Sequence, residues 1–367
     1  MAEQNQKRVQ LNLMPQLEGL RALCLLSIVV YHWTVQVVHL PLPFEIGAFV
    51  FFALSGYLIT RILLRGKKKW SEGTTSFGRF MRSFTMRRIL RLIPAYFVAL
   101  VLYLLVGSTE VWENFGWYAS NTSNIHFART GSWPGGADQF WTLAVDQQFY
   151  AFWPFLILLL PTRSLPAVLV LVAALAPASR YFSHFGWPCF SGPMDDKLPW
   201  FLTDYLCFGA LLAYLHESKR LPTKRILWIL SGVSLVLYLV MRYRMFGIED
   251  GDVLLILQQT LLAAFSTCLV GLCVYGMGGL GQKVLEHPVM QYIGKRSYGY
   301  YVYHNLALLI LGKVAFFLFP SADEPDYLYP VRFVLAGYIL YLLAHYSWRF
   351  IEEPLMKRKE KHKYQHS

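Results

Sequence analysis

The stretch VLLILQQTLLAAFSTCLVGLCVY, residues 253–275, decides the fold class because it contains no charged side chain. An apolar helix of about twenty residues crosses the hydrocarbon core of a bilayer, which is about 30 Å thick. Similar runs recur along the 367-residue chain, which is 55% apolar or aromatic and 15% charged. Since soluble domains are usually about 25% charged, the composition excludes one or two soluble domains with ordinary cores. It indicates a polytopic membrane protein.

The apolar runs predict an all-α transmembrane helix bundle of about ten helices. We expect one membrane domain at 20–352, between a cytoplasmic N-terminal segment at 1–19 and a basic cytoplasmic tail at 353–367. The first run is too long and too polar for the apolar core of a cleavable signal peptide, so we expect it to stay as a span. The expected helices are 20–38, 44–64, 89–107, 141–160, 165–179, 199–215, 226–241, 253–275, 298–318 and 331–350.

Basic residues set the predicted orientation. The chain has 34 Lys+Arg against 22 Asp+Glu, and an N-terminus inside the cell places most of the basic residues on cytoplasmic segments. An even number of helices keeps the basic C-terminal tail on that side, so both termini, the 65–88 loop and the 216–225 loop are expected to be cytoplasmic. The longest outer segment, 108–140, is expected to cover a site. Outer segments then hold few basic residues: Arg129, Arg180, Lys197, Arg242, Arg244, Lys313 and Arg332.

The positive charge and the cysteines suggest neither nucleic acid nor metal. Retention of Lys and Arg on the cytoplasmic side explains the net charge of +12, so we expect no nucleic-acid partner. The five cysteines have no spacing typical of a metal site, and we expect no metal. They are interpreted as small apolar core residues: Cys24, Cys189, Cys207, Cys268 and Cys273.

Ionisable residues inside apolar runs point to the site, because each costs about 2.5 to 3.5 kcal/mol to insert. The first helix carries Arg21 and His32, and a separation of eleven residues places them on one face about 16 Å apart along the axis. Taken singly, Arg21 can be a snorkelling anchor and His32 an interhelical hydrogen-bonding residue. Together on one face they favour a functional site.

A pair of arginines at the start of the third helix is suited to phosphate. Arg88 and Arg91 share a helix face, and a guanidinium group can bind two phosphate oxygens at once. Pro94 can begin or kink this span. Attraction to anionic membrane lipids is the alternative explanation for the basic loop that precedes it, which includes Lys67 to Lys69.

The fourth and ninth helices contribute further polar residues. Trp141, Asp146, Gln148 and Tyr150 fall in the first turns of the fourth helix, which we expect on the outer side. The alternatives are that Asp146 interacts with the helix dipole and that the aromatic residues form an interfacial belt. In the ninth helix, Ser297 and Tyr298 lie at the cytoplasmic entrance and His304 lies deeper. For the ionisable residues before Pro354, a structural role such as capping or pairing is expected.

These residues give the chain a resemblance to acyltransferase family 3, integral-membrane O-acyltransferases that modify surface polysaccharides and related glycans. Two departures are Asp146, where the family usually has Glu, and Glu18, where Asp is commoner. Some members carry an additional hydrolase-like domain, for which we expect no room here. Six motifs occur in order: Leu17 to Arg21 with His32, Phe51 to Leu58, Arg88 to Pro94, Trp141 to Tyr150, Ser297-Tyr298 with His304, and Glu353-Pro354.

The resemblance implies that 20–352 is a transmembrane acyltransferase domain in a bacterial cytoplasmic (inner) membrane, in contact with membrane lipids. It implies no bound cofactor, acyl-coenzyme A (acetyl-CoA) as co-substrate and a carbohydrate or glycolipid acceptor. It implies an essential arginine and histidine on the first helix, Arg21 and His32, and an arginine pair on the third, Arg88 and Arg91. With these, the predicted site residues are, for catalysis, His32, Arg21 and Asp146; for the donor, Arg88, Arg91, Ser297 and Tyr298; and for the acceptor, Trp141, Gln148, Tyr150 and His304.

Two mechanisms and two rival functions stay open at this point. His32 can act as a general base toward the acceptor hydroxyl, or it can form an acyl-histidine intermediate. A secondary transporter or flippase also needs intramembrane Arg, His and Asp, but it would move a substrate without covalent change. A membrane scaffold that binds lipid or a partner is the third interpretation.

Overall fold

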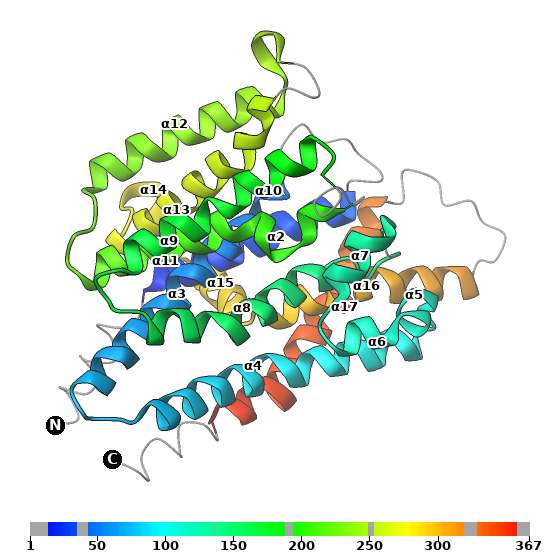
Figure 1. The fold of residues 1–367 in the computed structure, drawn as a ribbon. Helices are drawn as coiled ribbons and strands as arrows, with labels where there is room; N and C mark the ends of the chain where they lie inside the picture. The colour runs from blue at the N-terminus through cyan, green and yellow to red at the C-terminus, as the bar shows by residue number, and fades with distance from the viewer. Residues whose placement is uncertain are drawn as a thin grey trace.

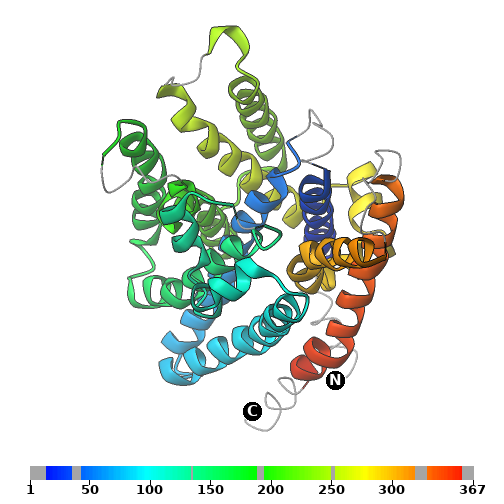
Figure 2. The ribbon, with the colours of Figure 1, turned by 90° about the vertical axis from the view of Figure 1, so that its right-hand side faces the viewer.

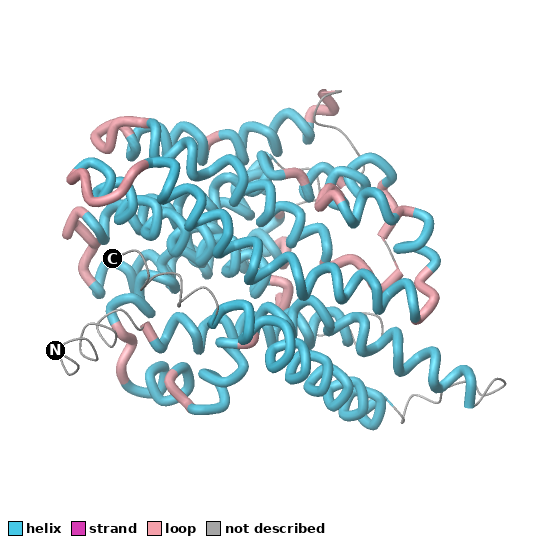
Figure 3. The backbone as a smooth tube through the Cα atoms, turned by 90° about the horizontal axis from the view of Figure 1, so that it is seen from below, coloured by secondary structure: helices cyan, strands magenta, loops and turns pink. Residues whose placement is uncertain are grey.

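The computed structural model describes residues 14–34, 43–133, 135–187, 194–248, 253–318 and 329–357. Within these ranges the chain forms helices and turns and no strand, as the tube in Figure 3 shows. Six helices among the described residues are long and apolar enough to cross a membrane. The prediction of an all-α membrane helix bundle is therefore confirmed.

Each predicted helix has an observed counterpart. Residues 35–38 of the first prediction lie outside the described residues, and the fifth prediction corresponds to two short helices in line. The counterparts are α2 (Pro15–Thr34), α3 (Ile46–Ser71), α4 (Phe77–Leu105), α8 (Phe140–Leu159), α9 (Leu165–Ala173) with α10 (Leu175–His184), α11 (Thr203–Glu217), α12 (Lys224–Arg242), α13 (Gln258–Tyr275), α16 (Ser297–Leu318) and α17 (Tyr329–Ser347).

The predicted loop at 65–88 is mostly helical. The basic residues there are good helix formers, so α3 continues to Ser71, and α4 begins after Ser76, whose side chain accepts a hydrogen bond from the Arg79 amide. Lys67 donates to the carbonyls of Ile157 and Leu160 at the end of α8. A cation at a helix C-terminus satisfies free carbonyl groups, so this lysine joins two helices.

Short helices that the sequence did not predict lie between the long ones. They are α5 (Thr109–Glu113), α6 (Phe115–Ala119), α7 (Ser123–Thr130), α14 (Gly279–Leu285) and α15 (Pro288–Lys295). The first three belong to the predicted outer segment, which is held to α4 by a hydrogen bond from the Tyr96 hydroxyl to the Tyr118 carbonyl. They are too short for periodicity to reveal.

Helix α3 runs through the middle of the bundle and packs against α2, α8, α11 and α13 (Figures 1 and 2). Its apolar window is 56% buried, against 22% for α12 at the periphery. Helices α3 and α11 can approach closely because Gly56 has no side chain. A Cβ atom at this position would lie only 2.1 Å from the Leu206 carbonyl oxygen. Small residues allow such backbone contact in membranes. The described cysteines, Cys24, Cys207, Cys268 and Cys273, are buried, as predicted.

Candidate active site

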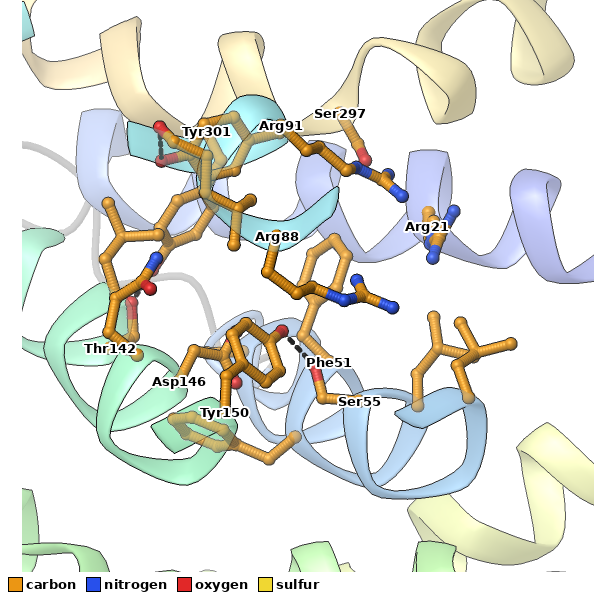
Figure 4. A pocket seen from close by; sticks show the side chains of 18 residues that line it. Arg21, Phe51, Ser55, Arg88, Arg91, Thr142, Asp146, Tyr150, Ser297 and Tyr301 are labelled. Atoms are coloured by element: carbon orange, nitrogen blue, oxygen red, sulfur yellow. Dashed lines mark hydrogen bonds between the residues drawn. The ribbon is translucent and has the colours of Figure 1, made fainter. Parts of the chain in front are cut away.

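A small cavity, which we call the arginine cavity, lies among α2, α3, α4, α8 and α16 and has a volume of ≈ 110 Å³ (Figure 4). It brings together the residues predicted for the donor, which lie more than two hundred positions apart in the sequence. Its polar lining residues are Arg21, Ser55, Arg88, Arg91, Thr142, Asp146, Gln147, Tyr150, Ser297, Tyr298 and Tyr301.

The cations of this cavity differ in their partners. In the described part of the chain, neither Arg88 nor Arg91, both partly buried, forms an ion pair with a carboxylate. The Arg88 guanidinium lies 5.4 Å from the centre of the Tyr150 ring. Arg21 lies on the same side of the cavity (Figure 4), and its Nη1 donates to both carboxylate oxygens of Glu18, at 2.8 and 3.0 Å. Two partly buried cations with no carboxylate within ion-pair distance suit an anionic ligand.

One face of α8 forms the opposite wall. Thr142, Asp146 and Tyr150 are spaced four residues apart and so lie on one face. The Asp146 Oδ1 atom is buried and accepts no hydrogen bond from the described residues. The sequence predicted Asp146 as a catalytic residue on the outer side, in contact with the acceptor or with a neighbouring helix. The residue lies about 9 Å along α8 from Phe140. At that depth it faces the arginine cavity.

The first residues of α16 meet α4 beside this cavity. Ser297 begins α16, is buried and lines the cavity. The Tyr298 hydroxyl donates to the Leu92 carbonyl oxygen at 2.7 Å, close to Pro94 in the interior of α4. This bond joins the start of α16 to α4. The Tyr298 hydroxyl is therefore occupied by α4, whereas its ring lines the cavity.

A larger cavity, the histidine cavity, has a volume of ≈ 950 Å³ and shares no lining residue with the arginine cavity. Helix α2 connects the two, since Arg21 lines the first and His32 the second. The segment that precedes α8 supplies one wall. The polar, charged and aromatic lining residues are Tyr31, His32, Trp133, Asp138, Asn305, Lys313, Phe316 and Arg332.

Hydrogen bonds determine the proton positions on two histidines. The His304 Nδ1 atom lies 2.6 Å from the Tyr301 carbonyl oxygen, which can only accept, so Nδ1 carries the proton. The His304 Nε2 atom of the neutral ring must then accept from His32 Nδ1 at 2.7 Å. The remaining nitrogen of a neutral His32, Nε2, therefore presents a lone pair. The tautomers of both histidines are thus assigned from the donors and acceptors of the hydrogen-bond network.

A second network supports the carboxylate next to His32. The Asp138 Oδ2 atom lies 3.6 Å from His32 Nε2. Asn305 Nδ2 donates to Asp138 Oδ1 at 2.5 Å and to Gln139 Oε1 at 3.0 Å. Gln139 Nε2 in turn donates to the Val302 carbonyl oxygen at 3.1 Å. Since a backbone carbonyl orients the Gln139 amide, the Asn305 amide and the Asp138 carboxylate are also oriented.

One turn of α16 separates the two cavities. The Tyr301 hydroxyl is hydrogen-bonded to Thr142 on the arginine-cavity side, as a dashed line in Figure 4 shows. The carbonyl of the same residue accepts from His304 on the histidine-cavity side. Tyr301 therefore touches both the arginine cavity and the histidine pair.

The predicted acceptor residues do not line the histidine cavity. Trp141 is buried beneath Lys197, whose Nζ lies 5.1 Å from its ring centre. Gln148 Nε2 donates to Asn124 Oδ1 at 2.9 Å and so joins α8 to α7. Tyr150 faces the arginine cavity, and His304 is fully buried behind His32. Trp141, Gln148 and His304 thus make contacts within the bundle, whereas Tyr150 lies at the arginine cavity.

Sequence reasoning missed two polar residues of the histidine cavity, Asp138 and Asn305. Both had a local signal, because Asp138 follows a glycine pair just before the fourth helix and Asn305 follows His304 directly. Neither signal separates a site residue from an ordinary loop or helix residue. Their proximity to His32 arises only in the folded bundle.

The motif at the end of α17 contains a buried acid. Glu352 closes a π-helical turn, is 3% exposed and accepts a hydrogen bond from Ser347 Oγ at 3.2 Å. Burial raises the pKa of Glu352 to about 7, although the positive charges of Arg91 and Arg296 oppose this shift. The neighbouring Glu353 pairs with Lys357 at 2.9 Å on the surface.

Comparison with known proteins gives three findings. A family model described as an acyltransferase domain matches residues 14–347. The peptidoglycan O-acetyltransferase OatA of Listeria monocytogenes is 26% identical over 380 residues, covering 94% of this chain and 56% of the relative. The O-acetyltransferase OatA of Staphylococcus aureus is 27% identical over 372 residues, covering 94% and 57%. The chain thus spans little more than half the length of these relatives. No solved structure matches it.

Proposed function

The chain belongs to acyltransferase family 3, and we propose that this integral membrane protein is an O-acyltransferase acting on a surface glycan or related carbohydrate. The donor is acyl-coenzyme A from the cytoplasm and the acyl group is acetyl. Both named relatives are O-acetyltransferases, one of them for peptidoglycan, which supports the choice of reaction. The membrane in this proposal is the bacterial cytoplasmic membrane.

The arginine cavity is the proposed donor site. Arg88 and Arg91 lack a carboxylate partner in the described chain and would pair with phosphate oxygens of coenzyme A. The orphan Asp146 Oδ1 atom is an acceptor suited to an amide N–H of the donor's flexible arm. Ser297 would offer a hydroxyl, and the Arg21–Glu18 pair would flank the entrance.

His32 is the proposed general base. Its Nε2 lone pair takes the proton of the acceptor hydroxyl as the hydroxyl oxygen bonds to the thioester carbonyl carbon. The carbon–sulfur bond of the resulting tetrahedral intermediate then breaks, and the imidazolium returns the proton to the departing thiolate. The thioester would reach His32 past Tyr301. The observation that carries this proposal is the position of His32: the residue lines the histidine cavity, and its Nδ1 atom lies 2.7 Å from His304 Nε2, which leaves its Nε2 atom for the substrate.

The test compares two substitutions of His32 in purified membranes supplied with radiolabelled acetyl-coenzyme A. His32→Gln keeps a hydrogen-bonding side chain but cannot accept a proton near neutral pH, and His32→Ala keeps neither property. A general base contributes about 10² to 10⁴-fold, so both variants should lose alkali-labile acetyl product by at least about 10²-fold. His184→Gln, an exposed position on α10, is the matched control and should keep full activity.

Near-normal acetylation by His32→Gln would show that the residue is only an interhelical hydrogen-bonding group. Flux of an unmodified substrate, with no acetylated product, would support a transporter instead. Label retained on the wild-type protein without acceptor, and absent from His32→Gln, would replace direct transfer by an acyl-histidine intermediate.

A further inference from the structure

An acidic side chain lies opposite the proposed base although no motif points to it. The Asp138 Oδ2 atom is 3.6 Å from His32 Nε2, and both residues line the histidine cavity. The Asp138 side chain is 23% exposed and the His32 side chain 16% exposed. Opposite charges at this depth would interact more strongly than on an open surface.

The proton positions make this arrangement unusual in the resting protein. Because His32 Nδ1 donates to His304, neutral His32 turns a lone pair toward the Asp138 carboxylate. A lone pair and a carboxylate repel each other and form no direct hydrogen bond. The arrangement becomes favourable when Nε2 gains a proton, since an N–H group then points at an anionic oxygen.

We propose that Asp138 is the electrostatic partner of His32, a positioning residue that stabilises the imidazolium formed when the acceptor hydroxyl gives up its proton. This inference rests on the proposed function. Asp138 itself keeps its charge and exchanges no proton: the proton moves from the hydroxyl oxygen to His32 Nε2, and later to the leaving thiolate. Charge placed in advance where charge develops lowers the barrier of the step.

The carboxylate is held for this role by neighbours on α16. Asn305 Nδ2 has two protons, and its bonds to Asp138 Oδ1 and Gln139 Oε1 use both. Asn305 therefore has no proton left for His32 Nδ1, which lies 3.3 Å away. Its amide fixes one carboxylate oxygen of Asp138 and leaves the other opposite His32. The Asn305 amide belongs to α16, so the residue spacing along α2 does not predict its position next to Asp138.

Among the described residues, the other charged and titratable groups around His32 belong to three helices. His304 lies behind it on α16, and Tyr31 precedes it on α2. Lys313 on α16 and Arg332 on α17 line the same cavity. Among the described residues lining the cavity, Asp138 is the acidic one, so it is the group that can offset the positive charge formed on His32.

The test is Asp138→Asn, which keeps the size of the side chain and an oxygen for Asn305 but removes the charge. We expect kcat to fall by about 10²-fold with an unchanged KM for acetyl-coenzyme A, since the arginine cavity is not touched. Without the carboxylate the imidazolium is less stable, so the acid limb of the kcat profile should move by about one pH unit or more toward lower pH. Asp138→Glu should restore part of the activity.

Glu113→Gln on α5 is the matched control, because it removes an exposed acidic charge from the same outer segment. It should change neither kcat nor the pH profile. An Asp138→Asn protein with normal kcat and an unmoved acid limb overturns the inference while leaving His32 as the base. Normal acetylation by His32→Gln in the same membranes overturns the role of His32 as the base, and the role of Asp138 with it. Absence of acetylated product from the wild-type protein overturns the proposed function.

Discussion

The partners of two partly buried arginines predict opposite effects of the same substitution. Arg88 has no carboxylate partner in the described chain, whereas Arg180 Nη1 donates to Asp204 Oδ2 at 2.8 Å. The Asp204 side chain is 0% exposed. Replacing each arginine by methionine keeps a long flexible side chain and removes the charge. The pair therefore compares a cation kept for a ligand with a cation kept for the fold.

The expected magnitudes follow from these contacts. Arg88→Met loses cation–π contacts with Tyr150 and Phe84, each worth about 0.5 to 1 kcal/mol, but it also removes the cost of a partly buried charge with no ion-pair partner. Its unfolding free energy should change by less than about 1 kcal/mol. Arg180→Met leaves the buried Asp204 carboxylate without its cation and should lose about 3 to 5 kcal/mol.

Donor affinity should follow the opposite order. A hydrogen bond to a charged group is worth about 1.5 to 3 kcal/mol, so Arg88→Met should weaken binding of coenzyme A by about one to two decades. Arg88→Lys should recover only part, because an ammonium lacks the two-pronged geometry of a guanidinium. Arg180→Met, where enough folded protein is recovered, should bind coenzyme A normally.

Two measurements on detergent-solubilised protein test this reasoning: thermal unfolding without ligand, and calorimetric titration with coenzyme A. Arg88→Met with unchanged affinity and a loss of stability as large as that of Arg180→Met would refute it. Arg88 would then be a structural residue, and the arginine cavity would lose its role as the donor site.

Two further predictions concern packing and pH. Gly56→Ala should lower the unfolding free energy by about 1 to 3 kcal/mol or more, because the added Cβ would lie 2.1 Å from the Leu206 carbonyl oxygen. In the control Gly232→Ala on α12 the added Cβ meets nothing within 4 Å, so this variant should be neutral or stabilising. Equal melting temperatures of the two variants would contradict this prediction. The pKa of Glu352 is raised to about 7 in the folded protein, so the folded state binds this proton more tightly than the unfolded state does. The stabilisation of the folded state by this proton is therefore lost as the pH rises through about 7. Glu352→Gln should therefore gain melting temperature relative to wild type between about pH 5 and about pH 8, and a difference independent of pH would show that Glu352 stays charged.

The sequence was sufficient for the long helices and for the face of α2. Long apolar runs reveal spans because each residue of a membrane helix faces either lipid or another helix, and this requirement is local. The helical period likewise places Arg21 and His32 on one face without knowledge of any neighbour. The pairing of Arg88 with Arg91 on α4 follows from the same local geometry, and both lie at one cavity.

Tertiary structure alone decided which residues meet. The depth of α8 relative to α4 places Asp146 at the arginine cavity. This offset depends on side-chain packing between helices, which no local pattern encodes. The same holds for Asp138, which approaches His32 because a loop before α8 and an amide on α16 reach the end of α2. Helical periodicity specifies the face of one helix. The facing partner depends on how far neighbouring helices slide and rotate as their side chains pack, and that is settled by the whole bundle at once.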